Sequence, residues 1–141
     1  MRNVAALAVG MAIWSGGALA DRCTKVEEIQ AVGVVPYLNT WQNVHLAFQQ
    51  FAHCDDGAVA EGYSEMVVRL MVEHWGQLSQ FRKLSHAEPR FEAFVLNKIN
   101  ATVDPKDLDK LHDLAKSKCA SGNTAVCRKI VARVEASWKD Q

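Results

Sequence analysis

Residues 53–65 read HCDDGAVAEGYSE and place a histidine, a cysteine, two aspartates and two glutamates within thirteen positions. Carboxylate and imidazole groups at this density could hold a divalent cation or transfer protons. In that interpretation Asp55, Asp56 and Glu61 would bind the cation beside His53, and the protein would be a small envelope enzyme or a small-ligand binder. A calcium-binding loop does not fit, because the stretch lacks the alternating oxygen ligands, the sixth-position glycine and the twelfth-position glutamate of such a loop.

The same residues also fit the start of a helix. An aspartate at position 55 or 56 would accept hydrogen bonds from the free backbone amides of a helix that begins near Gly57. Charged residues then recur every four positions, the spacing of one solvent-facing side of that helix: Glu61, Glu65, Arg69 and Glu73. The acidic stretch is therefore either a functional site or a helix cap followed by a solvated face.

Small residues lie beside this charged row. Ala58 and Gly62 are four apart, and a glycine inside a helix costs about 1 kcal/mol relative to alanine, so Gly62 indicates a close approach by another backbone or by a partner. One interpretation is a tight helix crossing within the fold. The other is a docking surface for a protein partner, made by Asp55, Asp56, Ala58, Glu61, Gly62, Tyr63 and Glu65.

Catalytic motifs are not apparent elsewhere. The five histidines are scattered, and no H-E-x-x-H pattern places two of them on one helix face. Glu73 and His74 are neighbours, but adjacent residues of a helix point about 100° apart. A cysteine nucleophile would need a free thiol. The sequence therefore predicts no catalytic residues, no metal site and no cofactor, and it favours a binding protein over an enzyme.

The first twenty residues, MRNVAALAVGMAIWSGGALA, have the pattern of a secretory signal peptide. Arg2 precedes an apolar run, which is shorter than the roughly 20 residues that a membrane-spanning helix needs. The ALA motif ending at Ala20 is typical of a cleavage site. We expect a signal peptide over residues 1–20 and one domain over residues 21–141, periplasmic or secreted after cleavage following Ala20 and not membrane-embedded.

The mature chain is expected to be nearly neutral. The signal peptide would remove one basic residue, Arg2, from 16 Lys and Arg that face 16 Asp and Glu, which leaves a formal charge near −1. No basic run stands out along the chain. This balance provides no general attraction to nucleic acid, and nucleic-acid binding is not expected.

Four cysteines lie in the mature part: Cys23, Cys54, Cys119 and Cys127. An even number of cysteines in an exported chain indicates two disulfides, for which three connectivities exist. If residues 120–126 form a turn between antiparallel helices, the cysteines that flank them come within bridging reach. We favour Cys119 with Cys127 and Cys23 with Cys54. The spacings fit neither a zinc site nor a C-x-x-C redox motif.

Helical periodicity extends over most of the mature chain. Pro105 follows a candidate cap, Asp104, which is the clearest helix start. Gly76 is expected to end the helix that begins near Gly57, and Ser85 to cap the helix after it. We expect His74 to belong to the buried face of its helix. We expect the aliphatic stem of Lys98 to lie over the edge of the buried face of its own helix. The pattern predicts an all-α, compact bundle of five to six helices stapled by two disulfides, at residues 22–32, 40–54, 57–75, 86–100, 104–119 and 123–140.

In outline the chain resembles the small helical, disulfide-containing periplasmic immunity proteins that neutralise type VI secretion amidase effectors. The resemblance lies in the ALA end of the leader, the segment AFQQFAHC ending at Cys54, and the long segment AVAEGYSEMVVRLMVEHW after it. It implies a protein partner, a homodimer as one expected state, and no cofactor. The expected function is that of an exported protein-binding module, an inhibitor or immunity protein against a cell-wall-degrading effector.

Overall fold

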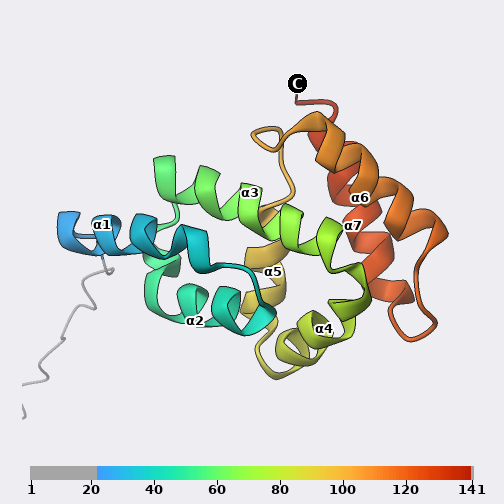
Figure 1. Cartoon of the computed structure of the whole chain (residues 1–141), viewed down its shortest axis with the longest axis horizontal. Helices are drawn as coiled ribbons and strands as arrows, with labels where there is room; N and C mark the ends of the chain where they lie inside the picture. Colours follow the sequence, from blue (N-terminus) through green and yellow to red (C-terminus); the bar gives the residue numbers. More distant parts are fainter. Residues whose placement is uncertain (1–21, 141) are drawn as a thin grey trace, which may run out of the picture.

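The computed structural model describes residues 22–140, which form seven α-helices and three 3-10 turns and contain no strand (Figure 1). The all-α class is confirmed, and the expected five to six helices fall short of the seven observed. The proposed leader and its cleavage site lie outside the described residues. The elements are α1 (Lys25–Val34), η1 (Val35–Tyr37), α2 (Trp41–Phe51), η2 (Ala52–Cys54), α3 (Gly57–Glu73), η3 (Trp75–Gln77), α4 (Leu78–Ala87), α5 (Pro89–Asn97), α6 (Pro105–Ser117) and α7 (Thr124–Ser137).

The longest helix, α3, connects the two ends of the molecule (Figure 1). It contacts α1 and η1 at one end and α6 at the other. Helices α1 and α2 lie side by side, and α6 and α7 pack against each other as a hairpin at the opposite end. Helix α5 contacts α2, α4 and α7. Among residues 22–140, the outer sides of α1 and α2 therefore lie at the surface.

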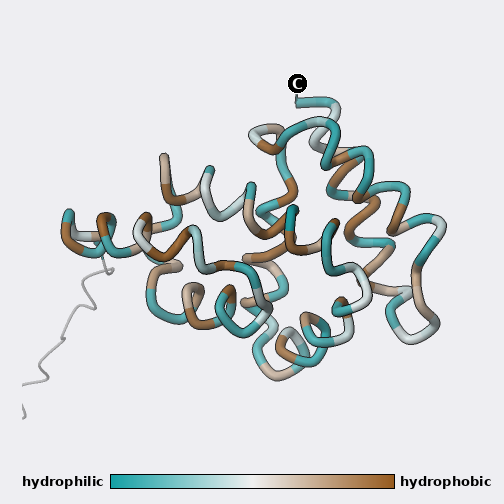
Figure 2. The backbone as a smooth tube through the Cα atoms, in the orientation of Figure 1, coloured by the Kyte–Doolittle hydropathy of each residue, from teal (hydrophilic) through white to brown (hydrophobic). Residues whose placement is uncertain are grey.

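One hydrophobic core runs through these helices. Its largest side chains include Trp41, Phe81 and Phe91, each fully buried. Their rings pack in sequence, with centroids 4.8 Å apart for Trp41 and Phe81 and 5.8 Å apart for Phe81 and Phe91, distances typical of tilted and edge-on aromatic pairs. Hydrophobic and hydrophilic residues alternate along the helices (Figure 2), as amphipathic packing around such a core requires.

Three expected helix starts are confirmed. The hydroxyl of Thr40 accepts a hydrogen bond from the backbone amide of Asn43 over 3.1 Å, and a carboxylate oxygen of Asp104 accepts one from Lys106 over 2.8 Å. Asp56 caps α3, since its carboxylate accepts from the amide of Gly57 over 2.8 Å. Each cap satisfies an amide that would otherwise have no partner at the helix terminus.

The expected helix at residues 86–100 is wrong at its start. Ser85 does not cap a helix but lies buried inside α4, of which His86 and Ala87 alone fell within a predicted helix. The actual break falls at Glu88, which is extended with φ −139° and ψ 91°. Pro89 causes this break, because a proline disfavours the helical conformation of the residue before it and is suited to the first position of the next helix.

The end of α3 also differs from expectation. The helix stops at Glu73, and His74 is exposed instead of belonging to the buried stripe. Gly76 lies within η3 and is not among the glycines with positive φ, so it does not end the helix in the left-handed conformation. The indole Nε1 of Trp75 donates to the carbonyl oxygen of Lys118 over 2.9 Å and fastens this corner to the α6–α7 loop.

Disulfides join Cys23 to Cys54 and Cys119 to Cys127, the two favoured pairs. The first fastens the residue before α1 to η2, at the end of α2. The second closes the loop between α6 and α7. Among residues 22–140, no helix is long and apolar enough to span a bilayer.

Candidate functional site

The seven residues expected to form a docking surface do not share one surface. Asp55 turns inward and accepts a hydrogen bond from the ammonium of Lys98, whose side chain is 3% exposed. Burial lowers the pKa of Lys98 below its usual value, and the carboxylate of Asp55 opposes that shift. Lys98 also lies 4.5 Å from the ring centroid of Phe94. The whole Lys98 side chain, including its ammonium group, is therefore buried, and it does not lie over the edge of the core as expected. Its bond to Asp55 connects the end of α5 to the start of α3.

Tyr63 is fully buried, and its hydroxyl has no hydrogen-bond partner in the structure. Its ring packs edge-on to Phe94 with the centroids 6.2 Å apart. Burial, and after it the negative charge of Asp55, raises the pKa of Tyr63 to about 12. A partner that docks on the surface of α3 cannot reach this side chain.

Gly62 serves a helix crossing. A Cβ atom built on it would lie 3.0 Å from Cγ2 and 3.2 Å from Cγ1 of Val35 in η1. Such distances are closer than ordinary packing, so the absence of a side chain at Gly62 is what lets η1 pack against α3. The internal-crossing interpretation of the small-residue pair therefore accounts for Gly62.

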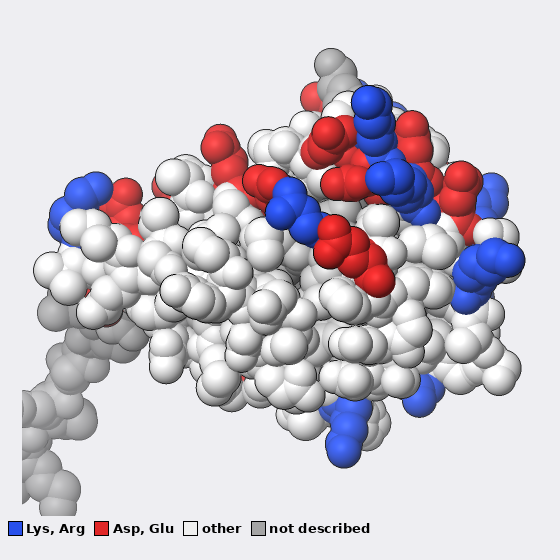
Figure 3. All heavy atoms as spheres, viewed as in Figure 1, with Lys and Arg blue, Asp and Glu red and all other residues white. Residues whose placement is uncertain are grey.

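Ala58, Glu61 and Glu65 line a polar depression of about 660 Å³ between α3 and the start of α6, whereas Asp56 caps α3 and does not line it. Two of its charged residues, Glu65 and Arg69, pair with each other, and Asp107 lies 3.3 Å from Lys110, which is outside the lining. Figure 3 shows acidic and basic side chains interspersed over this part of the molecule. The depression is consistent with a solvated face of α3. Its lining is Ala58, Glu61, Gly62, Glu65, Arg69, Thr102, Asp104 and Asp107.

The cation-site alternative depends on whether Asp55, Asp56 and Glu61 converge. Within residues 22–140, the one group of three potential ligands with atoms inside 4.8 Å of one another is Glu27, His53 and Cys54. The sulfur of Cys54 is bonded to Cys23 and is not free to bind a metal. The three acidic residues therefore do not form the shared site that a cation would require.

Three histidines form pairs with glutamates, and each pair joins two elements. The Nε2 of His45 in α2 lies 2.8 Å from a carboxylate oxygen of Glu88, between α4 and α5. The hydrogen bond from His45 lowers the pKa of Glu88. The other two pairs are His53 with Glu27, 3.3 Å apart, and His112 with Glu135, 3.0 Å apart. These pairs act as ties between elements.

A different surface carries the exposed hydrophobic residues. Six large hydrophobic side chains of residues 22–140 are exposed, and five of them lie on α1, η1 and α2. Monomeric proteins rarely gather such side chains in one region without a binding role. The five are Val26, Ile29, Val32, Tyr37 and Leu46; the sixth is Trp138, directly after α7.

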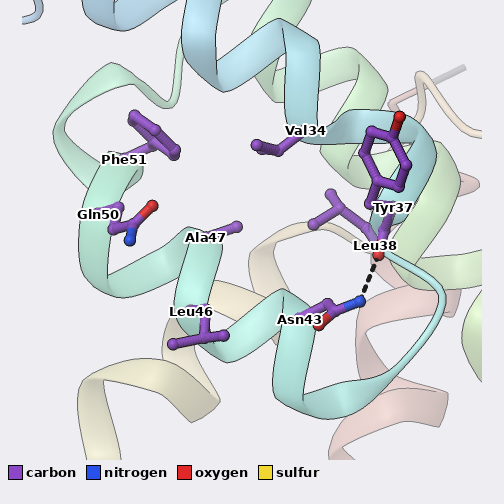
Figure 4. Close-up of a pocket in the computed structure, with 8 residues that line it drawn as sticks. All are labelled: Val34, Tyr37, Leu38, Asn43, Leu46, Ala47, Gln50 and Phe51. Carbon is purple, nitrogen blue, oxygen red and sulfur yellow. Dashed lines mark hydrogen bonds between the residues drawn. The ribbon is translucent and has the colours of Figure 1, made fainter.

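An apolar groove of about 300 Å³ lies within this region, between the end of α1, η1 and α2 (Figure 4). Its floor includes Leu38, Ala47 and Phe51, which belong to the core. Its rim includes Tyr37, 68% exposed, and Leu46, 53% exposed. The remaining lining residues are Val34, Asn43 and Gln50.

The groove lies in an uncharged part of the chain. From Ile29 to Cys54 the sequence contains no Lys, Arg, Asp or Glu, although these types make up 23% of all residues. Figure 3 shows a broad white surface between the charged side chains near α6 and those at the start of α1. The uncharged run is the feature of the sequence that could have predicted this groove. The sequence-based prediction placed the docking surface in the acidic stretch after the run instead.

No family model, curated protein or solved structure matches the chain.

Proposed function

We propose that this protein is an exported, non-enzymatic helical module that binds a protein partner through the surface of α1, η1 and α2. The observation that carries the proposal is the concentration of exposed hydrophobic side chains on α1, η1 and α2, four of which lie within the uncharged run from Ile29 to Cys54. By its resemblance to periplasmic immunity proteins, we propose that it acts as an inhibitor or immunity protein against a cell-wall-degrading effector. No cofactor takes part in this function.

The groove has the anatomy of a binding site for a protein. Buried aliphatic and aromatic residues form a floor that water solvates poorly, while Tyr37 and Leu46 project at the rim. Energetically dominant interface contacts usually fill such pockets, and tyrosine is enriched among them. A partner that covers Tyr37 and Leu46 would remove their apolar surface from water, which contributes roughly 25 cal/mol per Å² before the costs of association.

Two disulfides support an exported location, because such bonds persist in oxidising compartments and are rare in the cytosol. The proposed signal peptide agrees with this location. An enzyme or cation binder built on residues 53–65 is the weaker alternative. Asp55 is engaged with Lys98, Asp56 caps α3, and Glu61 lies apart from both in the depression beside α6.

The test is affinity capture from a periplasmic extract with the oxidised mature chain, immobilised through its C-terminal end. Helix α7 ends away from α1 and α2, so this attachment leaves the groove free (Figure 1). Wild type and Leu46→Met should capture the same protein, and Leu46→Glu should lose it. Trp138→Gln, which alters the exposed hydrophobic residue directly after α7, is the matched control and should retain it.

The captured protein should hydrolyse peptidoglycan, and adding the mature chain should inhibit that hydrolysis. Capture of no protein would contradict protein binding as the function. Capture of a protein without hydrolase activity would support a binding module while contradicting the immunity role. A wild-type chain that sediments as a dimer, and a Leu46→Glu variant that sediments as a monomer, would instead identify a second copy as the occupant.

A further inference from the structure

Resting on the proposed function, we infer that the α1–α2 groove receives one face of an amphipathic helix of the partner. That face presents aliphatic side chains at helical spacing and carries no charged residue where it contacts the groove. Val34, Ala47 and Phe51 face the space that these side chains would fill (Figure 4).

The charge of the groove determines the chemistry of its occupant. None of its eight lining residues is charged, and no Lys, Arg, Asp or Glu occurs from Ile29 to Cys54. A charged side chain of the partner, buried against this surface, would lose water without gaining a counter-ion, which is unfavourable. An uncharged apolar face of the partner incurs no such cost. The lack of charge in the groove therefore disfavours basic and acidic segments alike.

The polar groups of the groove are few and partly occupied. The side-chain amide of Asn43 donates to the carbonyl oxygen of Tyr37 over 2.8 Å and to Oδ1 of Asn39 over 3.4 Å. Among the lining residues, the amide of Gln50 and the hydroxyl of Tyr37 remain to bind polar groups at the edge of the occupant. Because the groove offers few hydrogen-bonding groups, it suits apolar side chains of the partner better than an extended backbone of the partner, whose polar groups would need hydrogen bonds.

The known modes of peptide recognition exclude several other kinds of segment as the occupant of the groove. Strand addition requires an exposed sheet edge, and residues 22–140 form no strand. Recognition of phosphorylated or acidic segments requires clustered arginines, which the groove lacks. Proline-rich segments bind rows of aromatic rings, whereas Tyr37 is the one exposed aromatic side chain of the lining. A helix in a groove between two helices fits the observed shape and composition.

The shape favours a foreign helix over a second copy of the chain. Placing the same surface of two copies against each other would oppose two hollows, which do not fill one another. A convex row of side chains, three and four residues apart on a helix, fills a hollow of this kind. The volume of about 300 Å³ lies at the lower limit for small-molecule pockets, which suits a few anchoring side chains.

A displayed library of helical peptides tests this inference. Peptides of about 18 residues, long enough to sustain helix, carry randomised residues along one face. The oxidised mature chain is the target. Selected peptides should contain Leu, Ile, Val, Met or Phe at the i, i+3 or i+4, and i+7 positions of that face, with no charged residue among them. Their affinity should fall at least tenfold for Leu46→Glu and remain within about twofold for Trp138→Gln, which lies outside the groove.

Three results would overturn the inference: selected faces rich in Lys or Arg, binding that Leu46→Glu leaves unchanged, or no selected peptide at all. Its failure is distinguishable from failure of the proposed function. If the periplasmic partner binds wild type and not Leu46→Glu, yet no helical face is selected, the binding function stands and the helix inference falls. If capture itself fails, the proposed function falls.

Discussion

The side-chain amide of Asn43 donates a hydrogen bond over 2.8 Å to the backbone carbonyl oxygen of Tyr37 (Figure 4). This bond ties the first turn of α2 to η1, two elements that form opposite sides of the groove. The backbone that carries the exposed ring of Tyr37 is thereby fixed relative to α2. Asn43 acts as a positioning residue for the rim of the groove.

Asn43→Ala should therefore weaken partner binding more than it weakens the fold. We expect a stability loss of about 0.5 to 1.5 kcal/mol, the usual net contribution of one hydrogen bond. Partner affinity should fall several-fold, because Tyr37 would have to be ordered on binding. Urea unfolding and a binding titration measure the two effects. Gln42→Ala, which removes an exposed side chain of α2 that bonds Gln80 outside the groove, is the matched control, and an equal affinity loss in both variants would contradict a positioning role for Asn43.

The buried ion pair of Lys98 and Asp55 should respond unequally to loss of either partner. Asp55→Asn leaves an ammonium inside the protein, where the Lys98 side chain is 3% exposed, without its counter-charge. We expect a loss of about 3 kcal/mol or more. Lys98→Met leaves Asp55, 24% exposed, in contact with water and should cost less.

The double variant Asp55→Asn/Lys98→Met should recover most of the stability lost by Asp55→Asn, since no unpaired charge remains. Urea unfolding of the four proteins completes the cycle. Equal losses for the two single variants, or strictly additive losses in the double variant, would show that the pair is not coupled as the structure indicates.

Because Gly62 packs against Val35, the effect of Gly62→Ala on stability should depend on the residue at position 35. In a helix, Gly→Ala normally gains about 1 kcal/mol. At position 62 the new Cβ would press on Val35, 3.0 Å away, so the gain should be reduced or reversed. In a Val35→Ala background the full gain should return. Thermal or urea unfolding measures both, and an equal gain in both backgrounds would contradict the crossing.

Tyr63 should make the fold sensitive to alkaline pH. Its pKa in the folded protein is raised to about 12 from an ordinary value of 10. As pH rises above 10, tyrosine in the unfolded chain loses its proton while folded Tyr63 keeps it, so stability is lost between pH 10 and 12. Tyr63→Phe removes this contribution. Lys98, whose pKa is lowered, acts in the opposite direction but is present in both proteins.

Unfolding free energies of wild type and Tyr63→Phe, measured from pH 8 to 12, should therefore diverge above pH 10 in favour of the variant. Below pH 10 their difference should be constant. Tyr63→Phe should not be less stable there, because the hydroxyl that it removes has no partner. Parallel curves over the whole range would contradict the burial of Tyr63.

Local chemistry allowed much of the fold to be predicted. Thr40, Asp56 and Asp104 cap helices through bonds to amides one to three residues away, so their roles can be read from neighbouring residues. The short loop that contains Cys119 likewise brings it near Cys127. The helix α4 was missed because Ser85 can cap a helix or lie inside one, and the restriction that Pro89 places on Glu88 decides between them.

The site depends on tertiary packing and was harder to predict. Gly62 faces Val35, and Asp55 meets Lys98, only because segments far apart in sequence pack together. The groove likewise arises from how α1, η1 and α2 lie, which no local pattern specifies. Its neutrality was nevertheless visible, since the run from Ile29 to Cys54 lacks charged residues. An uncharged run can therefore indicate a binding surface in a sequence, just as a cluster of charged residues can.

Amide hydrogen exchange of the oxidised chain of residues 21–141, measured with and without the captured partner, tests whether the partner binds in the groove. Binding should slow exchange in the second half of α1, in η1 and along α2, where the groove lies. Exchange in the segments 58–69 and 102–107, which contain the lining of the polar depression, should remain unchanged. Slower exchange confined to those two segments, with α1 and α2 unaffected, would show that the partner binds at the depression and not in the groove.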